Sequence, residues 1–208
     1  MPKYSFGTEY NIYYQGTNIP KNKFNIRDIP RLNEFEKALL LKSYSDFHRD
    51  LNNNPVFNET YFKTLHKATL QTLYDFAGEY RDQDVSKGDT LFCKAKYIHS
   101  QIKLLFEKLE TENHLNNFQY QPKESFAERI AYYMGELIAI HPFWEFNGRI
   151  IRMFFDMIAV YNGYEYINYS LPISKEITNP FIQASIECVQ AGDSSRLNEI
   201  IFIGLKKT

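Results

Sequence analysis

Cysteine, net charge and long apolar runs are all scarce in this sequence. The chain has two cysteines, Cys93 and Cys188, in 208 residues, and neither lies in a C-x-x-C pair, so a disulfide framework is excluded. The 24 basic residues nearly balance the 25 acidic ones, which gives no electrostatic case for nucleic acid or an anionic membrane as partner. No apolar run approaches the ~20 residues of a membrane helix. The first residues lack the pattern of a signal peptide, so none is expected.

Apolar residues are abundant and recur mostly at helical spacing. Hydrophobic residues make up 44% of the chain and aromatic residues 16%, which is enough for a folded core. The spacing predicts helices that start near Leu32, Ile98 and Asn147, and shorter helices over 179–191 and 195–205. A further helix is predicted after an N-cap at Asn58, continuing through Leu73 and Phe76. Another is predicted after a capping box of Ser125 and Glu128. We therefore expect an all-α fold, with an N-terminal arm and helix over residues 1–54 and a core domain over residues 55–205.

The segment from Arg81 to Cys93 departs from the helical pattern. Its middle, Lys87-Gly88-Asp89, suits a turn and its flanks favour β-structure, so a small hairpin with Gly88 at the turn is predicted. A hairpin on a helical bundle has two exposed edges, and such an edge can accept a partner's strand through main-chain hydrogen bonds. A solvated loop is the alternative.

The stretch HPFWEFNGRIIR, from His141 to Arg152, concentrates polar and charged residues between two predicted helices. Pro142 disfavours the α conformation at His141, so the first helix is expected to end there and to present His141 at the mouth of the loop. The next helix begins near Asn147 and Gly148. Free N–H groups at a helix start, next to a residue without a side chain, suit a bound anion.

Together these residues can support the transfer of a phosphate group. His141 titrates near neutrality and can take a proton from a hydroxyl, and Glu145 offers a hard oxygen ligand for Mg²⁺. Arg149 and Arg152, three positions apart, project from one side of the helix and can neutralise phosphate charge. The structural alternative is a capped helix–loop–helix in which Arg152 pairs with Asp156. The number of suitable groups within one short stretch favours the site.

The stretch resembles the signature of Fic-domain proteins, H-P-F-x-[D/E]-G-N-G-R-x-x-R. The segment YDFAGEYR, from Tyr74 to Arg81, is similar to the family's Y-x-[FW]-A-G-x-x-R pattern, and FAERIAYYMGELIAIHPF and ASIECVQAGDSSRLNEII resemble the helices around the motif. The resemblance covers residues 55–205. It implies a Fic-type helical bundle with a hairpin flap over residues 81–94, and the transfer of AMP from ATP to a hydroxyl side chain of a target protein.

Carried over residue by residue, the resemblance implies a role for each part of the motif. His141 would act as the general base, Glu145 would hold Mg²⁺, and Phe143, next to Pro142, would anchor the loop in the core. The residues implied to bind the phosphates are Asn147, Gly148, Arg149 and Arg152. The flap residues implied to dock a strand of the target are Val85, Ser86, Lys87, Gly88, Asp89, Thr90, Leu91 and Phe92.

One position departs from the family signature. Phe146 stands where the family usually has a glycine, which allows close approach to phosphates and a positive φ. A negative φ at Phe146 would let its ring turn aside, whereas a positive φ would strain it. Doc-type relatives also lack this glycine and phosphorylate their targets, but they replace the second glycine by lysine, whereas Gly148 is intact here. The resemblance favours AMP transfer, with altered transfer chemistry or a catalytically weak binding module as the alternatives.

Many Fic proteins are inhibited by a glutamate in [S/T]-x-x-x-E-[G/N], which pairs with the second arginine of the motif. Ser5–Glu9 and Ser195–Glu199 have this spacing, but neither is followed by glycine or asparagine, and the second lies in a predicted closing helix. By resemblance, a separate small antitoxin protein that supplies the glutamate is hypothesised as a partner. The expected location is the cytoplasm or, for a secreted effector, the cytosol of a host.

Overall fold

The computed structural model describes residues 5–6, 12–170 and 179–208. Its helices are α1 (Ile29–Asp50), α2 (Glu59–Leu70), α3 (Ile98–Thr111), α4 (Lys123–Ile140), α5 (Asn147–Tyr161), α6 (Pro180–Ala191) and α7 (Ser195–Gly204), with 3-10 turns at Leu51–Asn53, Ala95–Tyr97, Asn113–Leu115 and Phe118–Tyr120. Its strands are β1 (Ser5–Phe6), β2 (Val85–Lys87) and β3 (Thr90–Leu91). The predicted class, a helical bundle with a small hairpin, is confirmed.

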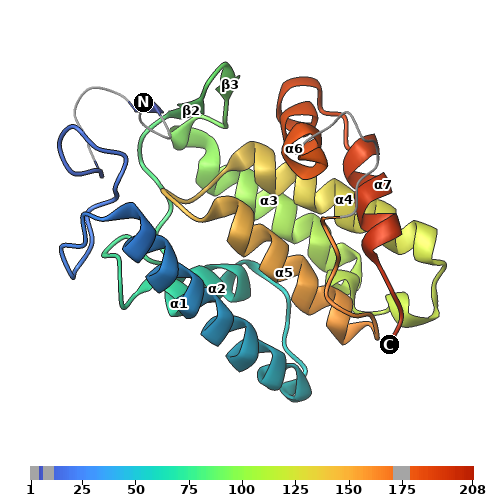
Figure 1. The fold of residues 1–208 in the computed structure, drawn as a ribbon. Helices are drawn as coiled ribbons and strands as arrows, with labels where there is room; N and C mark the ends of the chain where they lie inside the picture. Colours follow the sequence, from blue (N-terminus) through green and yellow to red (C-terminus); the bar gives the residue numbers. More distant parts are fainter. Residues whose placement is uncertain (1–4, 7–11, 171–178) are drawn as a thin grey trace.

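Helix α4 lies at the centre of the bundle. It packs against α3, α5, α6 and α7, while α1 and α2 pack against each other and against α5 (Figure 1). Helix α5 buries ten of its 15 residues. One cluster of buried side chains extends from Ile19 in the arm to Leu205 behind α7, and joins both sides of the predicted boundary between residues 54 and 55. The last turn of α4 and the first turn of α5, which carry the predicted site, are therefore held by the core.

Helix α2 ends earlier than the spacing predicted. It stops at Leu70, so Leu73 and Phe76 lie beyond it rather than on its face. The N–H groups of Leu73 and Tyr74 both bond to the Leu70 carbonyl at 2.8 Å, which turns the chain. This turn still buries Leu73 and Tyr74 almost completely. Tertiary packing, rather than a continued helix, therefore explains the apolar spacing here.

The predicted capping box of Ser125 and Glu128 is wrong. Helix α4 begins earlier, at Lys123, with Pro122 at the N-cap and without a side-chain cap, so Ser125 lies inside the first turn. Proline suits a helix start because its φ is fixed near about −65° and its missing N–H has no helical partner there. The other predicted cap is confirmed, since the Asn58 side chain accepts a hydrogen bond at the start of α2.

The hairpin of β2 and β3 confirms the prediction for residues 81–93, with Gly88 at the turn at a φ of +58°. Strand β1 pairs antiparallel with β2, which gives the sheet order β1-β2-β3. The expectation of two exposed edges is therefore wrong, because the N-terminal arm covers the outer edge of β2. On the other side of the hairpin, the Gln190 side chain of α6 donates to the Thr90 hydroxyl at 3.2 Å. The flap is thus tied to both ends of the chain.

The arm over residues 12–28 lies on the domain without forming a helix, as predicted. The chain turns back on itself: the Tyr14 N–H bonds to the Ile19 carbonyl at 2.9 Å, and the Lys21 N–H bonds to the Ile12 carbonyl at 2.7 Å. Ile12 and Ile19 are buried. Apolar burial and local backbone pairing together fix the arm.

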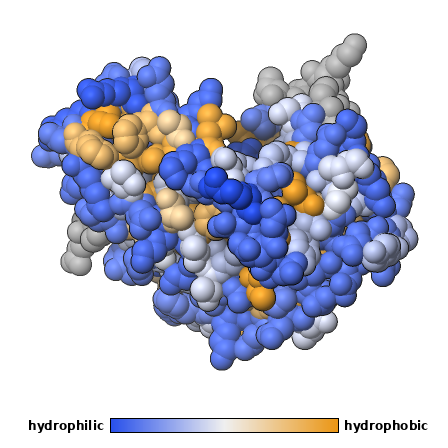
Figure 2. Space-filling view, turned by 90° about the horizontal axis from the view of Figure 1, so that it is seen from below, coloured by the Kyte–Doolittle hydropathy of each residue, from blue (hydrophilic) through white to orange (hydrophobic). Residues whose placement is uncertain are grey.

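The outer surface is mostly hydrophilic in the view from below, where the hydrophobic residues gather mainly toward one end (Figure 2). Among the described residues, no helix has both the length and the apolar character required to span a membrane.

Candidate functional site

His141 ends α4 with an unusual backbone. It is the C-cap of the helix, at φ +49° and ψ +58°, and its N–H bonds to the Leu137 carbonyl at 2.9 Å. Pro142 disfavours the right-handed helical conformation at His141, and the left-handed region costs a residue with a side chain about 1–2 kcal/mol. The predicted helix end is confirmed. The His141 ring is nine-tenths buried and stacks on the Phe92 ring of the flap, with 3.8 Å between ring centres.

Arg81 joins the flap to the loop that carries His141. It is 2% exposed, and its guanidinium donates to the carbonyl oxygens of Gln83 (2.6 Å), Cys93 (2.5 Å), Ile140 (3.1 Å) and His141 (2.8 Å). The rigid fork of donors on arginine suits such a set of acceptors. Sequence reasoning missed this role, and the one available signal was the place of Arg81 at the end of the Y-x-[FW]-A-G-x-x-R pattern.

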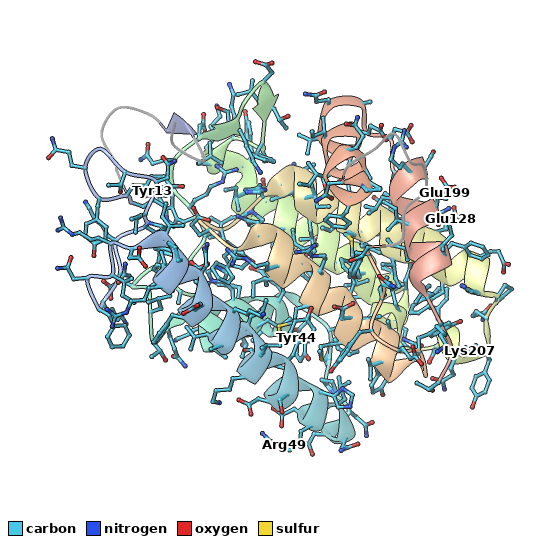
Figure 3. The ribbon with its side chains drawn as sticks, in the orientation of Figure 1. Tyr13, Tyr44, Arg49, Glu128, Glu199 and Lys207 are labelled. Atoms are coloured by element: carbon cyan, nitrogen blue, oxygen red, sulfur yellow. The ribbon has the colours of Figure 1, made fainter. Side chains whose placement is uncertain are left out.

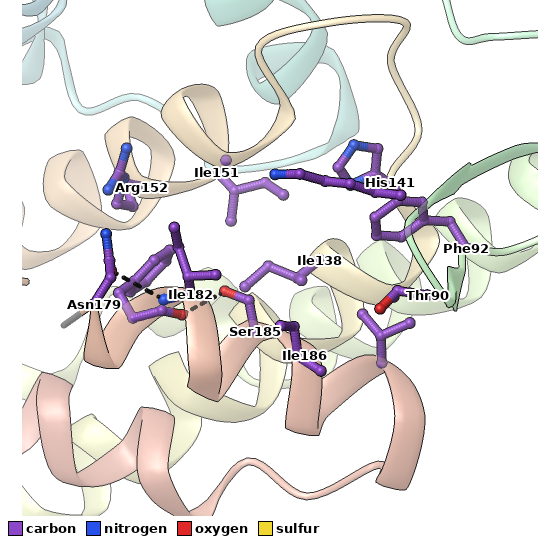
Figure 4. A pocket seen from close by; sticks show the side chains of 14 residues that line it. Thr90, Phe92, Ile138, His141, Ile151, Arg152, Asn179, Ile182, Ser185 and Ile186 are labelled. Carbon is purple, nitrogen blue, oxygen red and sulfur yellow. Dashed lines mark hydrogen bonds between the residues drawn. The ribbon is translucent and has the colours of Figure 1, made fainter. Parts of the chain in front are cut away.

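A cavity of about 400 Å³ lies between the flap, α5 and α6. Its lining consists of Lys87, Thr90, Phe92, Ile138, His141, Gly148, Ile151, Arg152, Asn179, Phe181, Ile182, Ser185, Ile186 and Val189. Figure 4 shows His141 and Phe92 at one end and Arg152 and Asn179 at the other. Helix α6 supplies a largely apolar wall, and α5 supplies the cationic end. Such a mixed lining and size suit a small ligand with an apolar part and an anionic part.

Phe143 and Asn147 anchor the loop between α4 and α5. Phe143 has no exposed surface and stacks on the His66 ring at 3.8 Å, which confirms its predicted place in the core. The Asn147 side chain accepts from the Phe143 N–H at 2.8 Å and donates to the Phe143 carbonyl at 2.7 Å. The Asn147 side chain therefore closes the loop, and its contact with phosphate stays a prediction.

His66 of α2 supports the same loop and stacks on the Phe143 ring. Its Nδ1 accepts a hydrogen bond from the Gly78 N–H at 2.8 Å, and its Nε2 lies 3.2 Å from the Glu145 carbonyl oxygen. Because Nδ1 accepts, Nε2 carries the proton and donates. Burial lowers the pKa of His66 to about 3. The ring is therefore neutral near pH 7 and acts as a fixed bridge between α2 and the loop.

Glu145 is buried against the arm. Its side chain accepts a hydrogen bond from the Tyr13 hydroxyl at 2.8 Å (Tyr13 is labelled in Figure 3). Trp144, the only tryptophan of the chain, packs with Ile12 and Tyr13. The described residues hold no group of three metal-binding side chains. Mg²⁺ commonly binds through one or two carboxylates together with substrate phosphates, so the single carboxylate of Glu145 has suitable chemistry for the predicted ion, but it lies outside the lining of the main cavity.

Phe146 adopts a positive φ of +66° just before α5. Of the two backbone conformations considered for Phe146, the positive and therefore strained φ is the one observed. Its ring is 2% exposed, and the guanidinium carbon of Arg149 lies 3.2 Å from the ring centre. Arg149 also donates to the carboxylate of Glu36 in α1 at 2.8 Å. Arg149 therefore points toward α1.

Sequence reasoning missed Glu36. It lies one turn after Leu32 and beside Phe35, on the face of α1 that turns toward the core, and it is 6% exposed. A carboxylate within an apolar stripe was the signal, because acidic side chains are rarely buried unless they are paired.

Arg152 faces the cavity instead of pairing with Asp156. Its guanidinium carbon lies 5.0 Å from the ring centre of Phe181 and 5.8 Å from that of Tyr169. Asp156 accepts hydrogen bonds from the hydroxyls of Tyr44 (2.7 Å) and Tyr169 (3.1 Å), and burial raises the pKa of Asp156 to about 6. Within the described ranges, no ion pair joins Arg152 to an acidic side chain.

A second cavity, of about 240 Å³, lies on the α1 side of α5. Its lining consists of Leu40, Tyr44, Arg149, Arg152, Asp156, Ile167, Asn168, Tyr169 and Ser170. Arg152 thus lines both cavities, whereas Arg149 lines the second alone.

The main cavity brings together part of the predicted site. The predicted residues that line it are His141, Gly148 and Arg152 of the motif and Lys87, Thr90 and Phe92 of the flap. The predicted residues outside its lining include Glu145, Asn147 and Arg149. Of the two motif arginines, Arg152 alone reaches the main cavity, while both line the second cavity.

Two glutamates, Glu9 and Glu199, have the spacing of the inhibitory motif described above. Glu199 is exposed on α7 (labelled in Figure 3), which agrees with its interpretation as part of a structural helix. Glu9 of the other candidate lies outside the described residues.

Comparison with known proteins identifies the family. The Fic/DOC family profile matches residues 56–159. The chain is 32% identical over 165 residues to the probable protein adenylyltransferase y4lH of Sinorhizobium fredii, which covers 79% of this chain and 82% of that protein. It is 32% identical over 154 residues to the probable protein adenylyltransferase Fic of Escherichia coli, with 73% of each covered. Protein adenylyltransferase VbhT of Bartonella schoenbuchensis is 30% identical over 90% of this chain and 39% of its own length.

Solved structures show the same fold. The BepC effector protein of Bartonella tribocorum, with bound AMPPNP, has a TM-score of 0.77 at 24% identity and covers 95% of this chain and 97% of that one. A Fic domain of a Bartonella quintana effector, with bound ADP, has a TM-score of 0.75 at 25% identity, with 95% of each chain covered. The present chain belongs to the Fic/DOC family.

Proposed function

We infer that this chain is a protein adenylyltransferase, which transfers AMP from ATP to a hydroxyl side chain of a target protein. Two relatives at 32% identity are named for this activity and align over most of their length. The observation in the structure that carries the inference is the main cavity, where His141, Gly148 and Arg152 face one space. A base, a helix start and a cation are the groups that such a transfer requires.

In the proposed reaction, the hydroxyl oxygen of the target attacks the α-phosphorus of ATP. A bond forms between that oxygen and the α-phosphorus, the bond from the α-phosphorus to the oxygen that bridges to the β-phosphate breaks, and pyrophosphate leaves. His141 accepts the hydroxyl proton. The first N–H groups of α5, at Asn147 and Gly148, stabilise the charge on the phosphate oxygens. Arg152 neutralises the departing pyrophosphate.

The loop is built to hold His141 in place for this step. The His141 carbonyl accepts a hydrogen bond from Arg81, and the His141 ring stacks on the Phe92 ring. Little reorganisation is then needed when the proton moves. We further propose that Glu145 holds Mg²⁺ together with the phosphates, since the ion supplies charge neutralisation when bound. The Tyr13 hydroxyl fixes the orientation of that carboxylate.

We propose that the target docks at the flap as an added strand. Strand β1 already pairs with β2, so the edge without a partner strand in the described part of the chain is that of β3, at Thr90–Leu91. Leu91 is 77% exposed. A strand added at β3 lies beside the cavity that His141 lines, which brings a target hydroxyl toward the base. A strand that displaced β1 from β2 would be the other way to dock.

We also propose a small antitoxin protein as an inhibitor, acting in the cytoplasm or, for an effector, before delivery to a host cytosol. Arg152 forms no ion pair among the described residues, although its charge acts on Asp156, so an external glutamate can bind it. Co-expression with the neighbouring reading frame, followed by co-purification, tests this partner. Recovery of the chain alone from every candidate pair would count against it.

The activity is tested by labelling reactions in cell lysate with Mg²⁺. ATP labelled on the α-phosphate is compared with ATP labelled on the γ-phosphate, each with the wild type and His141→Ala. A protein band that requires the α-label and His141 confirms AMP transfer. A band that requires the γ-label and His141 means phosphorylation instead, the alternative that Phe146 keeps open. Labelling that persists in His141→Ala would refute the role of His141 as base.

A further inference from the structure

The two arginines of the motif have different surroundings. Arg152 lines the main cavity as well as the second one, and its guanidinium lies near the rings of Tyr169 and Phe181. Arg149 lines only the second cavity, on the other side of α5. A nucleotide in the main cavity therefore meets Arg152 directly, whereas Arg149 is directed to α1.

Two side chains hold Arg149 in this direction. The Glu36 carboxylate accepts its Nη1–H at 2.8 Å, and the Phe146 ring lies under its guanidinium carbon at 3.2 Å. The carboxylate is itself fixed, because the Tyr74 hydroxyl donates to its other oxygen at 2.5 Å. The side chain of Glu36 is 8% exposed and that of Arg149 is 31% exposed. An ion pair of low exposure, stacked on an aromatic face, is a strong restraint on a long side chain.

Phe146 is a strained residue at this point. A φ of +66° costs a residue with a side chain about 1–2 kcal/mol, and a glycine would avoid this cost. The ring compensates by its burial and by its contact with Arg149. A strained side chain of this kind, beside a ligand cavity, suggests a functional reason for its presence.

We propose that Glu36 and Phe146 hold Arg149 outside the nucleotide cavity, so that Arg152 is the motif arginine that binds the polyphosphate of the donor. Glu36 and Phe146 are then specificity-determining residues, because they set how strongly the terminal phosphate of ATP is recognised. The inference rests on the proposed use of ATP, but it changes the role expected for Arg149 from phosphate ligand to structural cation.

Calorimetric titration of the full chain with ATP and with ADP, both with Mg²⁺, tests the proposal without any target. Arg152→Gln should weaken ATP binding at least about tenfold, the value of one charge-assisted hydrogen bond. The double variant Glu36→Gln with Arg149→Gln removes both charges of the pair, so neither is left buried alone. It should change ATP affinity by less than about threefold. Thermal melts establish that each variant is folded.

Release of Arg149 should have the opposite effect. Glu36→Gln and Phe146→Leu each remove one of its two restraints, and each should raise the ratio of ATP to ADP affinity by about threefold or more, because the freed cation can then reach the terminal phosphate. Phe155→Leu, a buried aromatic position on the same helix, is the matched control and should leave the ratio unchanged.

The outcomes separate this inference from the proposed function. A tenfold loss of ATP affinity in the double variant, with ADP little affected, would mean that Arg149 holds the terminal phosphate and would overturn the inference alone. An unchanged ratio in both Glu36→Gln and Phe146→Leu would also overturn it. A wild-type chain that bound neither nucleotide would overturn the proposed function and the inference together.

Discussion

The two sides of α5 differ in how completely their polar groups are used within the fold. On the side toward α1, Arg149 is paired with Glu36, and Asp156 accepts hydrogen bonds from two tyrosine hydroxyls. On the side toward α6, Gly148 and Arg152 line a cavity of about 400 Å³. One helix thus has a side whose polar groups are paired within the fold and a side that faces the main cavity.

The difference teaches that charge alone does not identify a ligand-binding residue. Arg149 and Arg152 are of the same type, one turn apart on the same helix, yet only one faces the main cavity. The buried Glu36 carboxylate on the neighbouring helix α1 pairs with Arg149 and directs it away from the main cavity. We therefore expect changes on the α6 side to affect activity and changes on the α1 side to affect stability first.

The largest effect is expected on the α6 side, at His141. His141→Ala should lower AMP transfer about 10²- to 10⁴-fold, because the proposed general base is lost, and should leave the protein folded although the ring stacking on Phe92 is lost. Transfer of α-labelled phosphate to the target, measured beside a urea titration, checks both expectations. Loss of folding in this variant would place His141 among the structural residues instead.

The next largest effect compares the two arginines directly. Arg149→Ala leaves the buried Glu36 carboxylate without its cation, so it should lower the free energy of unfolding by about 2–3 kcal/mol. Arg152→Ala removes a side chain that forms no direct ion pair in the described part of the chain, and it should cost less than about 1 kcal/mol. Urea unfolding followed by Trp144 fluorescence measures both. An equal loss in the free energy of unfolding for the two variants would mean that the two sides of α5 do not differ in this way.

A pH effect is expected from Asp156. Burial raises its pKa from 3.8 to about 6, so the folded state binds the proton more tightly than the unfolded state. The free energy of unfolding should therefore fall as pH rises through about 4 to 6, with a difference of about 1 kcal/mol between pH 5 and pH 7.5. Subtraction of the same curve for Asp156→Asn isolates this group. A difference of the opposite sign would mean that the tyrosine hydroxyls stabilise the carboxylate enough to outweigh its burial.

The smallest effect concerns the arm. Tyr13→Phe removes the hydrogen bond to Glu145 and should cost about 1 kcal/mol of stability, with a weaker response to Mg²⁺ because the carboxylate is less well oriented. The Trp144 emission maximum should shift as the packing of the arm loosens. Tyr14→Phe is the matched control, since the Tyr14 hydroxyl makes only long bonds, to the Asn22 carbonyl at 3.3 Å and from the Asn22 N–H at 3.4 Å. Identical behaviour of the two variants would exclude the positioning role of Tyr13.

Much of the fold could be read from the sequence because its signals are local. The spacing of Ile98, Ile102 and Leu105 predicted α3, and Gly88 predicted the turn of the flap. Pro142 predicted the end of α4 at His141, because the clash between a proline ring and the preceding residue is local. The early end of α2 at Leu70 was not predictable in this way, since the turn after it is made by packing.

Part of the lining of the main cavity was predictable from the sequence, but its geometry was not. The motif indicated His141, Gly148 and Arg152, and they line one cavity. The contacts of Tyr13 with Glu145 and of Glu36 with Arg149 join residues more than 100 positions apart. No spacing rule along the chain reports such pairs.

The sequence by itself determined the family, the helical class, the flap and the place of His141 at the end of α4, because each follows from residue types at short spacing. The tertiary structure alone decided that β1 covers the flap, that Arg81 ties the flap to the loop, and that Arg149 turns toward α1 while Arg152 faces the cavity. The physical reason is that burial, pairing and strain depend on which neighbours the fold brings into contact. The order of residues along the chain fixes the chemical groups, and the packing of the helices fixes which of them remain available to bind.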